Sequence, residues 1–473
     1  MNTADIRYKK LYMLFWIMVC LIGIVCLILN LGSQEFHSLV WLLPFAFLFV
    51  LSFLYRRNYL YHSTGILILN VVGFIRYCLL PFVILATHEY SSYLRYETYL
   101  DDAVFLMIYE MLAIYATLYF FGSRFYRKTN NVLIKYNTGS NLILWILIGI
   151  TVILYIRYPY LIGNTSIFKG VNDAQLFDTI RENNGLISIL WYVGLFCLNA
   201  YIMIFFKRKE DKTNKNRYMY ISLFITCLYL AVIYMSGVNI SRWYLLINII
   251  SIGVVYIKLY PSKVKTIFVV ILIPLSFILV IATYQKLELN TVDGDSYIER
   301  YTGGILNSTM LDSYFGGPAN VSTVLAMKER DYVESYSIFI MNDIINNMPG
   351  IASSVDKNKT SVYQFNRAIY GGMPSNDQIE PIIGQGLLHY GYILSPIYSI
   401  ILTFAIMYFD NKARNTQDLF LKIAMMLIMT WCCFFPFLNI TIILSVFYSR
   451  LIPVYIVAKV NSFISLKETS IIQ

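Results

Sequence analysis

The run "LYMLFWIMVCLIGIVCLILN", residues 11–30, decides the fold class of this chain. It is about twenty residues long and carries no charge. A helix rises 1.5 Å per residue, so a run of this length crosses the roughly 30 Å of hydrocarbon in a bilayer. The run is long and shows no small-residue cleavage site, so we interpret it as a membrane helix and not as a cleaved signal peptide.

Runs of the same kind recur along the whole chain. Of its 473 residues, 58% are hydrophobic and only 14% are charged, whereas soluble domains are about one quarter charged. Barrel strands would give shorter, alternating segments. We therefore predict an all-α, polytopic membrane helix bundle of about twelve transmembrane helices, with candidate spans at 11–30, 38–55, 64–87, 103–122, 139–158, 186–206, 218–236, 241–260, 264–283, 383–409, 418–436 and 440–458.

The net charge of +10 indicates membrane topology and not a nucleic-acid partner. Basic residues gather in every second connection, and the other short connections hold only Arg95, Lys169 and Arg181. The positive-inside rule makes the basic set cytoplasmic and predicts that both termini are inside. This set comprises Arg7, Lys9, Lys10, Arg56, Arg57, Arg124, Arg127, Lys128, Lys135, the group at 207–217, Lys258, Lys263, Lys265, Lys412, Arg414, Lys422, Lys459 and Lys467.

The seven cysteines all lie inside apolar runs, and none has the CxxC spacing of a zinc site. We interpret them as small hydrophobic residues and predict neither a disulfide framework nor a bound metal.

One connection is much longer than the rest. Residues 284–382, about a hundred, lie between the ninth and tenth candidate spans on the extracytoplasmic side. The chain thus divides into an N-terminal bundle at 1–283, a large loop at 284–382 and a C-terminal bundle of about three spans at 383–473. Within the loop, "YSIFIMNDIINNMPG" at 336–350 has helical spacing, and it fits either a helix on the membrane surface or a packed helix of a small external domain.

Four arginines lie within candidate spans, where a charge is expensive and is functional by default. Arg76 and Glu110 each stand about twelve residues from the cytoplasmic end of adjacent antiparallel spans, so we expect them to be level and to pair. Arg242 opens a span in "SGVNISRWYLL", where a guanidinium suits a forked bond to a phosphate or to a lipid headgroup. Arg157 and Arg450 are explained by snorkelling towards an interface.

The stretch "FNRAIYGGMPSNDQIEPIIGQGLLHYG", residues 365–391, is polar and glycine-rich and runs into an apolar span. Its chemistry is carried by Arg367, Asp377, Glu380, Gln385 and His389. A channel would show rings of repeated ligands, and none is seen here. The stretch predicts a polar pocket at the outer membrane surface, although a histidine at a helix start also serves as a cap or an interfacial residue.

These motifs resemble those of the Wzy-type polymerases of O-antigen and capsular repeat units. The likeness lies in the late external loop, in "FNRAIYGG" followed by "EPIIGQGLLHYG", and in the arginine of "SGVNISRW" at a span entrance. In this chain "LLHYG" occupies the position of the family's "NFG"-like ending.

The resemblance implies a glycosyltransferase in the bacterial inner (cytoplasmic) membrane. Such an enzyme polymerises undecaprenyl-pyrophosphate-linked oligosaccharide units on the outer face, without a metal or another cofactor. The donor, the acceptor and the bilayer are then its partners, with a chain-length regulator and a flippase as further candidates. The implied roles are pyrophosphate binding by Arg242, Arg367 and Arg76, and base catalysis by His389 or, second, Glu380.

Three alternatives stay open from the sequence. An O-antigen ligase-type transferase has a similar loop plan. A polysaccharide flippase or exporter would need polar residues facing a cavity through many spans. Asp101 and Asp102, in "YLDDAVF", would suit a metal-dependent glycosyltransferase, and the ordinary interpretation is that the helix dipole favours two carboxylates at a helix start.

Overall fold

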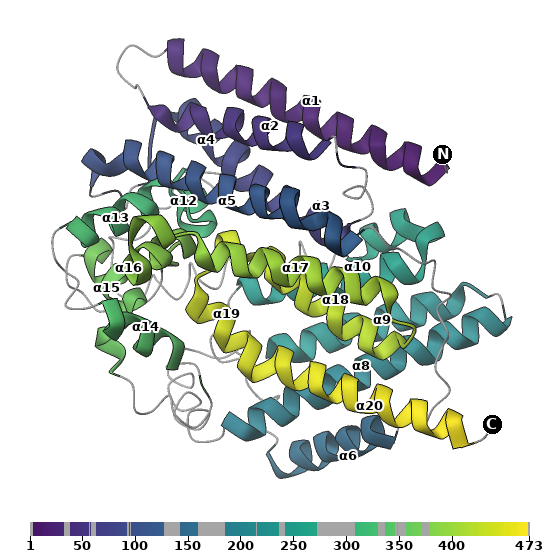
Figure 1. Cartoon of the computed structure of the whole chain (residues 1–473). Coiled ribbons are helices and arrows are strands. Elements are labelled where there is room, and N and C mark those ends of the chain that lie inside the picture. Colours follow the sequence, from purple (N-terminus) through teal and green to yellow (C-terminus); the bar gives the residue numbers. More distant parts are fainter. Residues whose placement is uncertain are drawn as a thin grey trace, which may run out of the picture. The chain divides into compact units, whose positions relative to one another are not determined.

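Helices make up nearly all of the residues that the computed structural model describes, and no strand occurs among them (Figure 1). Helices are expected because a segment inside a bilayer must satisfy its backbone N–H and C=O groups internally. The structure describes residues 3–32, 38–55, 57, 63–91, 94, 96–126, 142–158, 185–213, 215–235, 242–271, 308–329, 336–345, 348, 356–370 and 378–471.

The chain forms two compact units, each built from separate segments. Unit 1 comprises residues 1–129, 300–411 and 432–445, and unit 2 comprises 130–299, 412–431 and 446–473. The three consecutive segments expected from the sequence describe the order along the chain, whereas unit 1 draws on all three of them.

Unit 1 joins the first apolar helices to the described helices of the long connection at 284–382. Helix α13 packs on α5 and α16, and α14 packs on α16. The helices of unit 1 are α1 (Thr3–Gly32), α2 (Leu42–Tyr55), α3 (Thr64–Phe74), α4 (Leu80–Thr87), α5 (Leu100–Tyr126), α12 (Ser308–Phe315), α13 (Pro318–Glu329), α14 (Tyr336–Ile345), α15 (Ser361–Tyr370), α16 (Ile382–Leu394), most of α17 (Ile397–Asn415) and α19 (Ile440–Val446).

Unit 2 is a helix bundle in which α8 packs against α6, α9 and α20. Its helices are α6 (Leu142–Arg157), α8 (Gly185–Thr213), α9 (Arg217–Met235), α10 (Arg242–Leu259), most of α18 (Leu419–Cys433) and α20 (Ile452–Ile471).

Short 3-10 and π-helical turns connect some of these helices. Two π-helical turns, η3 (Ile75–Leu79) and η11 (Phe447–Leu451), each carry an arginine, Arg76 and Arg450. The 3-10 turns are η1 (Leu39–Trp41), η4 (Glu97–Tyr99), η6 (Pro261–Lys263), η9 (Lys357–Lys359) and η10 (Phe435–Phe437).

The exposed surface of α1 is apolar. Its side chains include Leu14, Leu21 and Ile28, which are 62%, 59% and 61% exposed. Such a continuous apolar surface is unfavourable in water. It is the surface expected of a helix that contacts lipid, and the membrane class predicted from the sequence agrees with it.

Five described helices are long and apolar enough to cross a membrane, and the number rises to seven if each of two bent helix pairs counts as one span. The expected number of about twelve spans stays a prediction. The predicted span 264–283 is helical over its first part, up to Ile271, and the rest of it lies outside the described residues.

The predicted span 383–409 is not one continuous helix, and it counts as a single span only if its two bent helices are taken together. The chain bends by 103° between α16 and α17. Gly391 has the left-handed backbone angle φ 77°, which glycine adopts without strain, and Pro396 then prevents the first helix from continuing. The bend brings the two arms of the pair close to each other.

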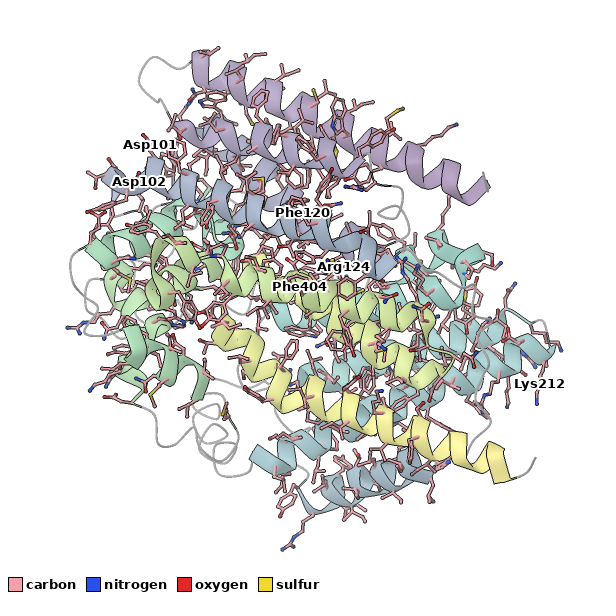
Figure 2. The ribbon with its side chains drawn as sticks, viewed as in Figure 1. Asp101, Asp102, Phe120, Arg124, Lys212 and Phe404 are labelled. Atoms are coloured by element: carbon pink, nitrogen blue, oxygen red, sulfur yellow. The ribbon has the colours of Figure 1, made fainter. Side chains whose placement is uncertain are left out.

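Helix α5 has charges of opposite sign at its two ends. Asp101 and Asp102 lie in its first turn, and Arg124 lies in its last (Figure 2). Both aspartates are exposed, and this placement suits the helix dipole. In the residues that the structure describes, no group of three or more His, Cys, Asp or Glu side chains could hold a metal ion.

Candidate active site

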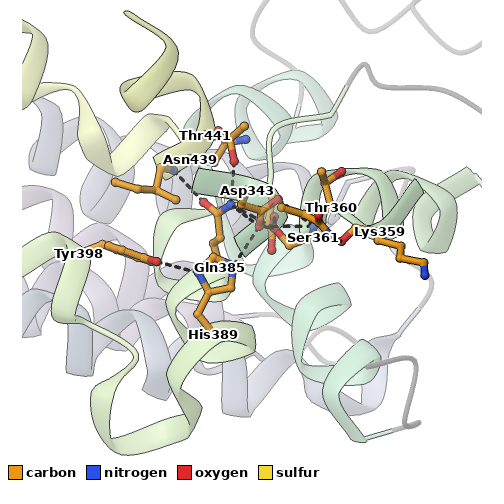
Figure 3. A network of polar contacts seen from close by, with 12 residues as sticks. Asp343, Lys359, Thr360, Ser361, Gln385, His389, Tyr398, Asn439 and Thr441 are labelled. Carbon is orange, nitrogen blue, oxygen red and sulfur yellow. Dashed lines mark hydrogen bonds and ion pairs between the residues drawn. The ribbon is translucent and has the colours of Figure 1, made fainter. Parts of the chain in front are cut away.

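The candidate site is centred on the carboxylate of Asp343, which lies on α14 and is fully buried (Figure 3). His389 Nε2 lies 2.9 Å from Asp343 Oδ2, and Gln385 Nε2 donates to the same oxygen at 3.1 Å. Ser361 donates from its backbone N–H to Oδ1 at 3.1 Å and from its hydroxyl to Oδ2. Four donors therefore stabilise one buried negative charge.

Ordinary helix geometry brings these donors together. Gln385 and His389 are four residues apart and so share one face of α16. Ser361 opens α15, so Asp343 sits at the positive end of that helix. Helices α14 and α15 of the long connection thus supply the carboxylate and the hydroxyl, and the apolar helix α16 supplies the imidazole.

Both ring nitrogens of His389 have a hydrogen-bond partner. It is 2% exposed, and its Nδ1 lies 2.7 Å from the Tyr398 hydroxyl on α17. If Nε2 carries the proton that faces the Asp343 carboxylate, Nδ1 accepts the hydrogen bond from Tyr398. A neutral imidazole with a carboxylate behind it has the arrangement of an oriented general base.

Glu380 joins the same network but in a different protonation state. Its Oε2 lies 2.7 Å from the Ser361 hydroxyl, which also contacts Asp343. One hydroxyl has one proton, so one of the two carboxyl groups must donate to the serine oxygen. Burial, followed by the charge of Asp343, raises the pKa of Glu380 well above its ordinary value. Glu380 is therefore the neutral, donating member.

Gln385 connects this network to the start of α19. Its Oε1 accepts the Ile440 N–H at 2.7 Å, and its Nε2 also contacts the Thr441 hydroxyl at 3.0 Å. The helix-start N–H of Ile440 is thereby satisfied, and the amide orientation of Gln385 is set. With Tyr398 on α17, the network joins five helices, α14, α15, α16, α17 and α19.

The glycines of the polar stretch have specific roles. A Cβ at Gly386 would lie 2.0 Å from the Ser395 carbonyl oxygen, so the two arms of the bend can approach only with glycine there. Gly391 supplies the positive φ of the bend itself. Asp377 lies outside the described residues.

Arg76 and Glu110 form the ion pair expected from their level positions in the two spans. Arg76 Nη1 lies 2.9 Å from Glu110 Oε2, and both side chains are fully buried. The contact lacks the alignment of a hydrogen bond. Arg76 Nε donates to the Gly316 carbonyl at 3.2 Å, and Ser399 donates to Glu110 Oε1 at 2.7 Å. This burial favours the structural pairing over pyrophosphate binding by Arg76.

Four further arginines were singled out in the sequence: Arg367, Arg242, Arg157 and Arg450. Arg367 is exposed on α15, six residues after Ser361. Arg242 begins α10 in unit 2, and its side chain lies outside the described residues. Arg157 is exposed at the end of α6. Arg450 lies over the Tyr192 ring with its guanidinium carbon 4.0 Å from the ring centroid.

Sequence reasoning selected His389, Glu380 and Gln385 but missed Asp343, Ser361 and Tyr398. One feature of the sequence points to Asp343, since it is the one charged residue in the amphipathic helix at 336–345. No such feature points to Ser361 or Tyr398, since a serine and a tyrosine are common in an external loop and at a membrane interface.

Asp312, on α12, is a further buried carboxyl group. Its Oδ1 accepts the Ala319 N–H at 3.2 Å, and burial raises its pKa to about 7. A pKa raised on folding contributes stability that is complete below about pH 4, the ordinary value, and is lost as the pH rises through 7.

We expect Asp312→Asn to reduce the loss of thermal stability between pH 5 and pH 8. The change in unfolding free energy over this range should fall by about 1–3 kcal/mol, since one pKa unit corresponds to about 1.4 kcal/mol. The melting temperature of both proteins at the two pH values measures the effect. Asp101→Asn, at an exposed position, is the control, and an equal pH response in wild type and Asp312→Asn would contradict the assignment.

Comparisons of this chain with protein-family models, with curated proteins and with solved structures find no match in any of the three.

Proposed function

We propose that this protein is a membrane glycosyltransferase that joins undecaprenyl-pyrophosphate-linked oligosaccharide units into O-antigen or capsular polysaccharide on the outer face of the bacterial inner membrane. One observation carries the proposal. It is the oriented His389–Asp343 pair, 2.9 Å apart, where the external-loop helices meet α16. The resemblance of the surrounding motifs to repeat-unit polymerases supports the same reaction class.

The reaction needs one base. A hydroxyl of the acceptor glycan attacks the anomeric carbon of the donor, a new C–O bond forms, and the bond from that carbon to pyrophosphate breaks. The hydroxyl proton passes to His389, and Asp343 stabilises the resulting imidazolium. Glu380 is the weaker candidate for the base, because a protonated carboxyl group cannot accept another proton at Oε2.

Pyrophosphate is a good leaving group, so it needs charge stabilisation more than protonation. The exposed Arg367 guanidinium projects from the helix that begins at Ser361. It is our first candidate for the donor phosphates, and Arg242 is the second. Arg76 is not assigned to the phosphates, because its guanidinium is engaged with Glu110 and Gly316.

Polymerisation by the purified protein tests the proposal directly. The protein in lipid nanodiscs is given a defined undecaprenyl-pyrophosphate repeat unit, and the products are separated by length. A ladder of increasing repeat number is expected. A single transfer to a lipid acceptor would favour a ligase, and transport without a new glycosidic bond would favour a flippase. Either outcome would overturn the polymerase assignment.

We expect Arg367→Ala to lower the polymerisation rate about tenfold, which corresponds to about 1.4 kcal/mol of transition-state stabilisation. An exposed charge is screened by solvent, so a larger effect is not expected. Lys359→Ala removes the same charge at an exposed position just before α15 and serves as the matched control. Equal losses in both variants would show that net charge, and not a guanidinium contact, is responsible.

A further inference from the structure

The buried base does not itself reach the surface. His389 is 2% exposed, whereas the acceptor hydroxyl of the proposed reaction arrives from outside. The other imidazole nitrogen of His389, Nδ1, lies 2.7 Å from the Tyr398 hydroxyl. The Tyr398 hydroxyl lies 3.2 Å from that of Tyr390, which is 36% exposed. A continuous path of hydrogen bonds thus connects Asp343 to a tyrosine that is partly exposed.

The bend between α16 and α17 makes this path possible. Tyr390 and Tyr398 are eight residues apart, which is about 12 Å along a straight helix. The 103° bend brings their hydroxyl groups within hydrogen-bond distance. The rings of His389, Tyr390 and Tyr398 also pack edge to face, with centroids 5.5–6.0 Å apart, so each ring restrains the other two.

The direction of the hydrogen bonds follows from the Asp343 carboxylate. In the tautomer whose Nε2 proton faces Asp343, Nδ1 accepts from Tyr398 and Tyr398 accepts from Tyr390. Every proton in the chain can therefore move one position inward. Among the described residues, Asp343 on α14 and the two tyrosines are titratable groups of this path, Glu380 is linked to it through Ser361, and Lys328 lies over the ring of the neighbouring Tyr392.

We propose that Tyr390 is the catalytic residue that receives the proton of the acceptor hydroxyl, and that Tyr398 is a positioning residue that passes a proton to His389. This inference rests on the proposed function. The acceptor proton moves to Tyr390, the Tyr390 proton to Tyr398, and the Tyr398 proton to His389 Nδ1. The electron pair stays on the acceptor oxygen, which forms the new glycosidic bond as pyrophosphate leaves.

Phenylalanine substitutions keep the rings and remove only the hydroxyl groups. We expect Tyr390→Phe and Tyr398→Phe each to lower the polymerisation rate about tenfold, and the double variant to be no slower than the slower single one. The two residues would then act in one path. Tyr392→Phe removes an exposed neighbouring hydroxyl that lies outside this path and is the matched control. The wild-type polymerisation rate, plotted against the fraction of D₂O in H₂O/D₂O mixtures, should give a curve, as expected when several protons move. The same plot for Tyr390→Phe should be linear.

A second measurement separates this inference from the proposed function. With ¹⁵N-labelled histidine, assigned through His389→Asn, NMR reports the exchange of the His389 ring protons with solvent. We expect that exchange to slow at least fivefold in Tyr390→Phe. If wild type makes no polymer, the proposed function fails and the exchange rate alone decides on the path. Unchanged exchange in Tyr390→Phe, or unchanged polymerisation beside an active wild type, overturns the path.

Discussion

Replacing Arg76 with methionine is expected to destabilise the protein by about 3–5 kcal/mol. The loss of one member of a buried ion pair leaves the other charge without compensation. Glu110 would keep only the hydrogen bond from Ser399, at 2.7 Å, inside a fully buried site. The midpoint of denaturant-induced unfolding in detergent, followed by tryptophan fluorescence, measures the change.

The double variant Arg76→Met/Glu110→Met provides the decisive comparison. It removes both charges and keeps similar apolar volume, so it should recover most of the lost stability. Asp211→Asn breaks a half-exposed ion pair with Lys207, 2.9 Å long and one helical turn apart, and should cost less than about 0.5 kcal/mol. A double variant as unstable as Arg76→Met would show that Arg76 stabilises the fold through Gly316 and not through Glu110.

The contrast between Arg76 and Asp343 explains what can be predicted from this sequence. Arg76 and Glu110 lie on consecutive predicted spans, so residue counting from the span ends predicts that they are level, even though Arg76 stands in a π-helical turn. Asp343 reaches His389 only after the external loop has folded back onto α16, and no local spacing encodes that approach. Partners within one helix, such as Gln385 and His389, are predictable from their four-residue spacing, whereas partners between loop helices are not.

The bend after α16 shows a second limit of prediction from the sequence. The apolar run 383–409 has the length and composition of one span, and hydropathy averages over its interruptions. Gly391 and Pro396 are visible in the sequence, but each is also tolerated inside membrane helices, so neither alone predicts a 103° bend. The bend follows from close packing, since Gly386 admits the Ser395 carbonyl where any larger residue would clash.

Asp343→Asn is expected to lower the polymerisation rate about 10³-fold, within the 10²–10⁴ range attributed to a positioned base. The asparagine amide would present a donor to groups that now donate to Asp343, among them Gln385 Nε2. It would also remove the charge that stabilises protonated His389. His389→Gln should have an effect of similar size, and the double variant should be little slower than either single one, because the two residues act as a unit.

Glu380→Gln separates a catalytic charge from a structural contact in the same network. A neutral amide reproduces the donor of a protonated carboxyl group at the Ser361 hydroxyl, so this variant should lose less than about tenfold. Rates are normalised to folded protein by size-exclusion chromatography and melting temperature, since Asp343 is fully buried. A folded Asp343→Asn protein that polymerises within threefold of wild type would remove Asp343 from the mechanism. A loss in Glu380→Gln as large as in His389→Gln would instead make Glu380 the base, with its proton given up when substrate binds.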